Sequence, residues 1–132
     1  MINWETEWPL IKEEAIRCGV DPFFIATIRK VENGGLGREF GILSETASLY
    51  ADQLHDACAS VRNRIIEFIA QLYILHVYDG VRRLCYTKGF ITMFSNRWAP
   101  PKVANDPDNL NANWLANALI TYQEFCAKGG PS

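Results

Sequence analysis

Glu32 is the residue whose type and position point most directly to chemistry. It ends an apolar stretch that contains Ile28 and Val31, and Asn33 and two glycines follow it. The dipole of a helix disfavours a carboxylate at its C-terminal end by a few tenths to about 1 kcal/mol, and apolar surroundings disfavour the charged form further. Both effects favour a carboxylic acid that keeps its proton near neutral pH, as general acid catalysis requires.

A glycine-rich segment, residues 34–43, follows Glu32. Its glycine content disfavours a helix and leaves room for the backbone of a bulky substrate to come close. Two further carboxylates, Glu39 and Glu45, lie in or just after this segment and are candidates for a second catalytic group. The alternative interpretation is a solvated glutamate at a helix end, followed by a glycine cap, and the spacing alone favours that alternative.

The segment 97–114 is the second stretch suited to a binding site. It combines Trp98 and Trp114 with three prolines and several Asn and Asp residues. A sugar site needs flat apolar faces beside amide donors and acceptors, so we expect Trp98 or Asn105 to line a cleft. Each also has a purely structural interpretation, because tryptophans often anchor a core or loop and Asn105–Asp106–Pro107 can form a turn by itself.

Composition excludes several classes of protein. The chain has 132 residues, 48% of them hydrophobic, which is enough for one domain with a real core. A net charge of -2 with dispersed Lys and Arg argues against a nucleic-acid-binding protein. The longest apolar-rich stretch, 65–77, is interrupted by Glu67 and His76, so no membrane span is expected. The start of the chain lacks the basic region of a signal peptide.

Metal and cofactor sites are not predicted. The four cysteines form no C-x-x-C pair, and neither His55 nor His76 has a second ligand at metal-binding spacing. The glycine-rich string GGLGREFG does not follow the dinucleotide-binding pattern, and no strand is expected before it. We therefore expect no metal and no cofactor, and reduced thiols rather than disulfides.

The elements that must position these residues are mostly helical. Apolar residues recur at three-to-four spacing, and Asp21 with Pro22 forms a helix start. The pattern predicts a mainly α single domain over residues 1–132, with about five helices and little or no sheet. Helices are expected over 4–18, 22–32, 46–77 (as one helix or as two with a bend), 81–96 and 113–128. In this arrangement Glu32 stands at the end of the second helix.

The stretch from Val20 to Ser44, VDPFFIATIRKVENGGLGREFGILS, resembles the catalytic segment of the lysozyme-like superfamily. It is most similar to lytic transglycosylases and to small proteins of this type from phages and prophages. In that superfamily an apolar helix ends in Glu, followed by a small polar residue and Gly. A glycine-containing loop then leads to a turn made of Gly, two hydrophobic residues and a polar residue. The matching positions are Glu32-Asn33-Gly34 and Gly41-Ile42-Leu43-Ser44.

The resemblance implies a lysozyme-like helical domain with a glycine-rich active-site loop. It implies that Glu32 protonates the glycosidic oxygen between N-acetylmuramic acid and N-acetylglucosamine in peptidoglycan. The substrate-binding residues that it suggests are Ser44, Trp98, Asn105 and Tyr122. The sequence departs from the family where Ser44 replaces a common Gln, and where the residues around Tyr122 lack the usual Tyr-Asn-Ala-Gly-like turn. We expect a lytic transglycosylase rather than a hydrolase, because no second carboxylate is an obvious partner.

Two other functions remain open from the sequence. A lysozyme-like domain can serve as a non-catalytic carbohydrate-binding module, or as a structural part of a virion or secretion apparatus. A helical adaptor could instead dock a partner through Trp4 and Trp8, which share one helical face. The expected partner is peptidoglycan or a related N-acetylated glycan strand. Without a signal peptide, we expect the protein to be cytoplasmic until released, or associated with a phage particle, and to act on the cell wall.

Overall fold

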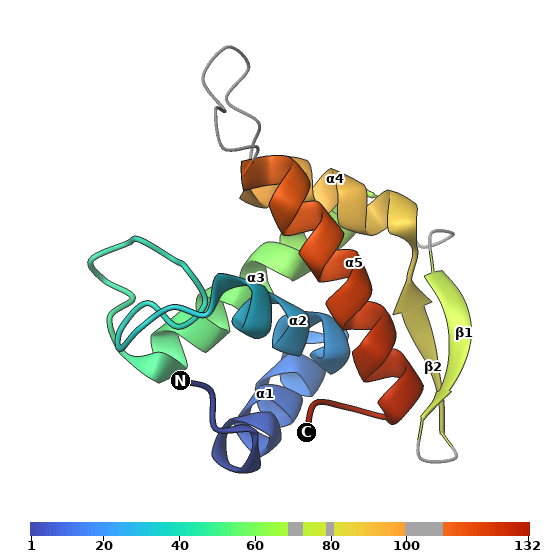
Figure 1. Cartoon of the computed structure of the whole chain (residues 1–132), viewed down its shortest axis with the longest axis horizontal. Helices are drawn as coiled ribbons and strands as arrows, with labels where there is room; N and C mark the ends of the chain where they lie inside the picture. Colours follow the sequence, from blue (N-terminus) through green and yellow to red (C-terminus); the bar gives the residue numbers. More distant parts are fainter. Residues whose placement is uncertain (69–72, 79–80, 100–109) are drawn as a thin grey trace.

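The computed structural model describes residues 1–68, 73–78, 81–99 and 110–132. This part of the chain is mainly helical, as predicted, and holds five helices and one β-hairpin (Figure 1). The elements are α1 (Trp4–Cys18), α2 (Pro22–Glu32), α3 (Tyr50–Glu67), β1 (Tyr73–Tyr78), β2 (Val81–Tyr86), α4 (Lys88–Trp98) and α5 (Leu110–Lys128). In the described residues, no helix has both the length and the apolar character needed to cross a membrane.

The first two helices have the bounds that the sequence predicts, because their ends are set by local capping. The Asn3 side chain accepts a hydrogen bond from the Thr6 N–H at the start of α1, and Gly19 ends that helix in a left-handed conformation. Asp21 accepts from the Phe23 N–H at the start of α2. At the other end Asn33 ends α2, with a φ of 46°.

The central helix is α2, which lies among α1, α3 and α5 (Figure 1). Seven consecutive residues, from Phe23 to Arg29, are buried. When every face of a helical stretch is buried, neighbouring elements must pack against it on all sides. The ring of Phe24 contacts four other rings, with centroids 5.1–6.1 Å away, and these belong to Tyr86, Phe90, Phe94 and Tyr122. This packing fixes the axis of α2 and therefore the place where Glu32 emerges.

The prediction of helices over 46–77 and 81–96 is wrong in part. The first of them is α3, which ends at Glu67, and β1 and β2 then pair antiparallel with Tyr73 opposite Tyr86. Both strand sequences, YILHVY and VRRLCY, contain the β-branched and aromatic residues that favour strands, and an Asp-Gly dipeptide between them is a strong hairpin signal. This local preference outweighs the three-to-four spacing, so the later helix begins only at Lys88.

The segment 33–49 between α2 and α3 contains no helix or strand. Gln53 of α3 is fully buried and binds the second half of this segment. The Gln53 Oε1 atom accepts from the backbone N–H groups of Phe40 (3.1 Å) and Ile42 (3.2 Å). The Gln53 Nε2 atom donates to the carbonyls of Ile42 (2.8 Å) and Ala47 (2.5 Å). One amide therefore fixes the course of the loop beside Glu32.

Candidate functional site

Glu32 is held by two tryptophans. The indole N–H of Trp98 donates to Glu32 Oε2 at 2.8 Å, and the indole N–H of Trp114 donates to the same oxygen at 2.7 Å. Trp98 is the last residue of α4 and Trp114 lies in the first turns of α5. Both rings pack against Phe94, with centroids 5.4 Å and 6.0 Å away. The end of α2 is therefore joined to α4 and α5 through a single carboxylate oxygen.

The two oxygens of the carboxyl group have different surroundings. Oε2 accepts both indole hydrogen bonds, which are strongest to an electron-rich oxygen. Oε1 faces Gly41, since a Cβ atom added at Gly41 would lie 2.1 Å from it. When Glu32 carries a proton, the proton therefore belongs on Oε1, beside the glycine.

Gly41 is required in this place for two independent reasons. Its φ is 78°, a left-handed conformation that disfavours any residue with a Cβ. The close approach to Glu32 also leaves no room for a side chain. Gly34 is constrained too, because a Cβ there would lie 1.6 Å from the Arg38 carbonyl oxygen. The glycine-rich segment thus allows the loop to fold back against the end of α2.

A cavity of about 610 Å³ lies beside this carboxyl group. Its walls include the Trp98 and Trp114 side chains, Gly41 and Ile42 of the loop, and the amide side chains Asn113 and Asn117 of α5. Among the residues that the structure describes, Glu32 is the only charged residue lining it. The cavity combines flat aromatic rings, amide groups and a single acid. Ligand cavities typically have volumes of roughly 300–1,000 Å³.

The structure places the residues expected at the site in different parts of the molecule. Trp98 is brought together with Glu32, as described above. Ser44 is exposed in the loop, where its hydroxyl lies 2.8 Å from that of Thr46, and it does not line the cavity. Asn105 lies outside the described residues.

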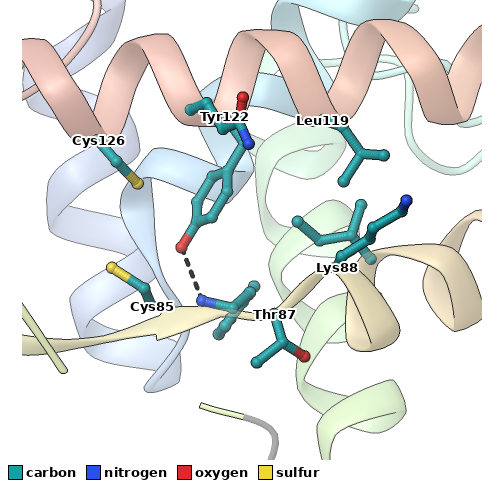
Figure 2. A pocket seen from close by; sticks show the side chains of 9 residues that line it. Cys85, Thr87, Lys88, Leu119, Tyr122 and Cys126 are labelled. Atoms are coloured by element: carbon teal, nitrogen blue, oxygen red, sulfur yellow. Dashed lines mark hydrogen bonds between the residues drawn. The ribbon is translucent and has the colours of Figure 1, made fainter. Parts of the chain in front are cut away.

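Tyr122 lies at the other end of α2. Its hydroxyl donates to Asp21 Oδ2 and accepts from the Tyr86 N–H at 2.8 Å (Figure 2). Asp21 caps the start of α2, eleven residues and therefore about 16 Å along the helix from Glu32. Burial raises the pKa of the Tyr122 phenol, and the neighbouring Asp21 raises it further. Tyr122 thus joins α5 to α2 and β2 rather than contacting Glu32.

A second cavity, of about 460 Å³, adjoins Tyr122 on the side of β2 and α5 (Figure 2). Cys85 and Cys126 face this space from opposite sides. Lys88 is the one charged residue among the described residues of its wall. With no carboxylate in that wall, this cavity offers no acid for catalysis, and the Glu32 cavity is the better candidate.

The possible second carboxylates do not line the Glu32 cavity. Glu39 is 6% exposed and lines a different cavity, of about 440 Å³, together with Glu7 and Arg29. Its Oε1 atom has no hydrogen-bond partner in the described part of the chain. Glu45 is exposed in the loop. Among the described residues, no second carboxylate therefore lines the cavity beside Glu32.

Sequence reasoning missed three residues of the site. The sequence points to Trp114 together with Trp98, but the residues expected to line the cleft are Trp98 or Asn105 and not Trp114. Asn113 and Asn117 are four residues apart and therefore share a face of α5. This spacing, directly beside Trp114, was the available signal for a polar wall on the last helix.

Comparisons with known proteins found no relative of this chain. No family model matches the chain, and neither a curated protein nor a solved structure matches it significantly. Function is therefore argued from the geometry around Glu32 and from the resemblance of the 20–44 segment.

Proposed function

We propose that the protein cleaves peptidoglycan glycan strands between N-acetylmuramic acid and N-acetylglucosamine, with Glu32 as general acid and base, in a lysozyme-like fold. One observation carries the proposal. The Glu32 carboxyl is fixed by two indole N–H groups at the wall of a cavity of about 610 Å³, where it is the only charged group among the described residues. An acid held in one orientation at a glycosidic bond is the central requirement for cleaving that bond.

The proposed first step uses the oxygen that faces Gly41. Glu32 Oε1 gives its proton to the glycosidic oxygen, and the bond between that oxygen and the anomeric carbon of the muramic sugar breaks. The departing N-acetylglucosamine keeps the proton as a hydroxyl. The Trp98 ring, which is only half-buried, offers a flat face for a sugar. The Asn113 and Asn117 amides can hydrogen-bond the N-acetyl groups.

The second step favours a lytic transglycosylase. Glu32 Oε1, now without its proton, takes the proton of the muramic 6-hydroxyl while that oxygen bonds to the anomeric carbon, so a 1,6-anhydro ring forms and the acid is regenerated. Hydrolysis through a second carboxylate needs that group roughly 5–9.5 Å from the first. Neither Glu39 nor Glu45 lines the cavity, which supports the route that uses one carboxylate.

Digestion of purified peptidoglycan with the intact chain tests this function. Products are separated and identified by mass spectrometry, because an anhydromuramic end is lighter by one water molecule than a reducing end. We expect anhydromuramic ends. Reducing ends would replace the transglycosylase with a hydrolase, and intact strands after incubation with folded protein would contradict the proposed function.

One observation favours a second candidate, a non-catalytic binding module. The two indole hydrogen bonds also make Glu32 a tie between α2, α4 and α5, a role that needs no turnover. For such a module we expect the protein to sediment with insoluble peptidoglycan while releasing no fragments. Release of fragments that depends on Glu32 would exclude this alternative.

A further inference from the structure

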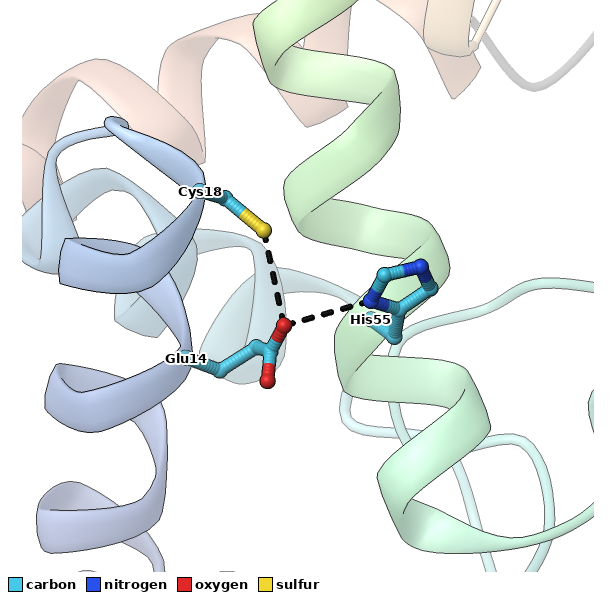
Figure 3. A group of neighbouring side chains, drawn as sticks. All are labelled: Glu14, Cys18 and His55. Carbon is cyan, nitrogen blue, oxygen red and sulfur yellow. Dashed lines mark hydrogen bonds and ion pairs between the residues drawn. The ribbon is translucent and has the colours of Figure 1, made fainter.

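A second group of reactive side chains lies where α1 packs on α3. Glu14 and Cys18 of α1 point toward His55 of α3 (Figure 3). Glu14 Oε1 lies 3.2 Å from His55 Nδ1 and 3.4 Å from Cys18 Sγ. All three ligand atoms lie within 4.8 Å of one another. A carboxylate oxygen, an imidazole nitrogen and a sulfur thus converge on one point from two helices.

Two of the three separations match the edges of a zinc coordination tetrahedron. Bond lengths of about 2.1 Å to nitrogen or oxygen and about 2.3 Å to sulfur put two ligand atoms about 3.4 Å (O to N) or about 3.6 Å (O to S) apart. The observed distances of 3.2 Å and 3.4 Å are within a few tenths of an ångström of these values. The third separation, between Cys18 Sγ and His55 Nδ1, is at most 4.8 Å, so side-chain rotations that bring these two atoms closer would place a cation between the three.

The surroundings leave these atoms accessible to a metal. His55 is 63% exposed, so the cluster opens to solvent and a water molecule can complete the coordination. Arg17 binds the other carboxylate oxygen, Glu14 Oε2, at 3.2 Å and leaves Oε1 free of that contact. The buried thiol of Cys58 lies beside that of Cys18 on the inner side. Thiolate, imidazole and carboxylate together are ligands that zinc prefers.

We propose that Glu14, Cys18 and His55 bind one zinc ion, with water as the fourth ligand. The site differs from the sequence expectation of no metal because its ligands come from two helices and not from one local motif. On binding, the Cys18 thiol gives its proton to solvent and its sulfur bonds to zinc, with no change in oxidation state. The ion would cross-link α1 to α3 and does not depend on catalysis at Glu32.

Metal binding by the full-length protein tests the proposal. The protein is stripped with a chelator, dialysed against zinc and assayed by elemental analysis, and cobalt replaces zinc for absorption spectroscopy. We expect one zinc per chain, and for cobalt a thiolate charge-transfer band with the visible bands of a four-coordinate ion. Cys18→Ser and His55→Ala should each weaken zinc binding at least about tenfold. Cys126→Ser removes a half-buried thiol outside the cluster and should bind zinc as the wild type does.

The outcomes separate this site from the proposed function. Glu32→Gln should retain zinc, so a failure of catalysis does not affect the result. His55→Ala changes an exposed side chain and should stay folded, which keeps the test valid if Cys18→Ser does not fold. Wild-type protein without stoichiometric zinc, a cobalt complex without the thiolate band, or unchanged affinity in His55→Ala would each overturn the proposal.

Discussion

At the scale of single residues, the main feature is that one oxygen of Glu32 accepts two indole hydrogen bonds while the other faces Gly41. In the proposed reaction Trp98 and Trp114 would be positioning residues, because both contact Glu32 Oε2 rather than the substrate's reacting atoms. A hydrogen bond to a charged group contributes about 1.5–3 kcal/mol. Two such bonds to one atom restrict the orientation of the carboxyl group, whose Oε1 atom faces Gly41.

Replacing either indole by phenyl removes the N–H and keeps an aromatic ring. We expect Trp98→Phe and Trp114→Phe each to lower kcat for peptidoglycan cleavage by at least about tenfold, with a smaller effect on KM. Steady-state rates on solubilised glycan strands measure kcat and KM separately. Trp4→Phe is the control, since Trp4 packs edge-on against Phe125, away from the cavity. Unchanged kcat in both site variants would show that the indoles do not orient the acid.

Some of these residues can be predicted from the sequence and others cannot, because only some of them depend on local features. The position of Glu32 at the end of a helix can be predicted, because the end of an apolar helix and the glycines after it are local features, whereas its catalytic role rests on the resemblance. Trp98 could be suggested from its residue type alone. Its partnership with Trp114 depends on how α4 docks against α5. The Glu14, Cys18 and His55 cluster likewise depends on the packing of α1 on α3, which no local spacing reveals.

At the scale of elements, the loop 33–49 lies beside Glu32 and contributes Gly41 and Ile42 to the wall of its cavity. The Gln53 side-chain amide hydrogen-bonds the backbone of the loop, and Gly41 has a positive φ where the loop lies against Glu32. The loop was predicted from its glycines. The hairpin was missed because the three-to-four apolar spacing was given more weight than the β-branched and aromatic residues of the two strands and the Asp-Gly dipeptide between them.

We expect Gly41→Ala to lower the stability of the folded protein and to disturb the position of Glu32. The left-handed conformation alone costs a residue with a Cβ about 1–2 kcal/mol, and the added methyl group would displace Glu32 Oε1. We expect a comparable or larger loss in the free energy of unfolding, measured by urea denaturation, and at least a tenfold loss of cleavage rate.

Gly35→Ala is the matched control six residues earlier. A Cβ at Gly35 meets no atom within 4 Å, so the change in stability should stay within about 0.5 kcal/mol. Equal effects of the two substitutions would show that the approach of Gly41 to Glu32 is not what constrains the loop.

At the scale of the whole molecule, two polar networks, one part-buried and one buried, join the helices around α2. Arg29 Nε donates to Glu7 Oε1 at 2.6 Å, and the Tyr50 hydroxyl donates to the same oxygen at 2.9 Å. This network joins α1, α2 and α3. At the opposite end of α2, Tyr122 joins α5 and β2 to Asp21. The helix that carries Glu32 is thus tied to its neighbours at both ends.

The first network makes stability depend on pH. Burial raises the pKa of Glu7, but hydrogen bonds from Arg29, the Asn3 N–H and Tyr50 outweigh burial and hold the pKa below its ordinary value of 4.5. The stabilisation is therefore fully present above pH 4.5 and is lost as the pH falls through the lower pKa of the folded state. We expect Glu7→Gln to be less stable than wild type near neutral pH, with a smaller loss of stability upon acidification.

Urea denaturation at a series of pH values from about 6 down to about 3 measures this difference. Glu13→Gln is the control, because it removes the same charge from a side chain that is 73% exposed. A Glu7→Gln curve parallel to the wild-type curve throughout this range would show that Glu7 does not provide the pH dependence.

The most direct test of the central claim is the rate of glycan-strand cleavage by Glu32→Gln beside Glu45→Gln. The first substitution keeps the shape of the side chain and removes the acid, and the second makes the same change in the exposed loop. General acid–base catalysis contributes about 10²–10⁴-fold. We expect Glu32→Gln to lose at least about a hundredfold in rate while folded, and Glu45→Gln to cleave as the wild type does. Cleavage by folded Glu32→Gln at the wild-type rate would contradict the role of Glu32 as the acid.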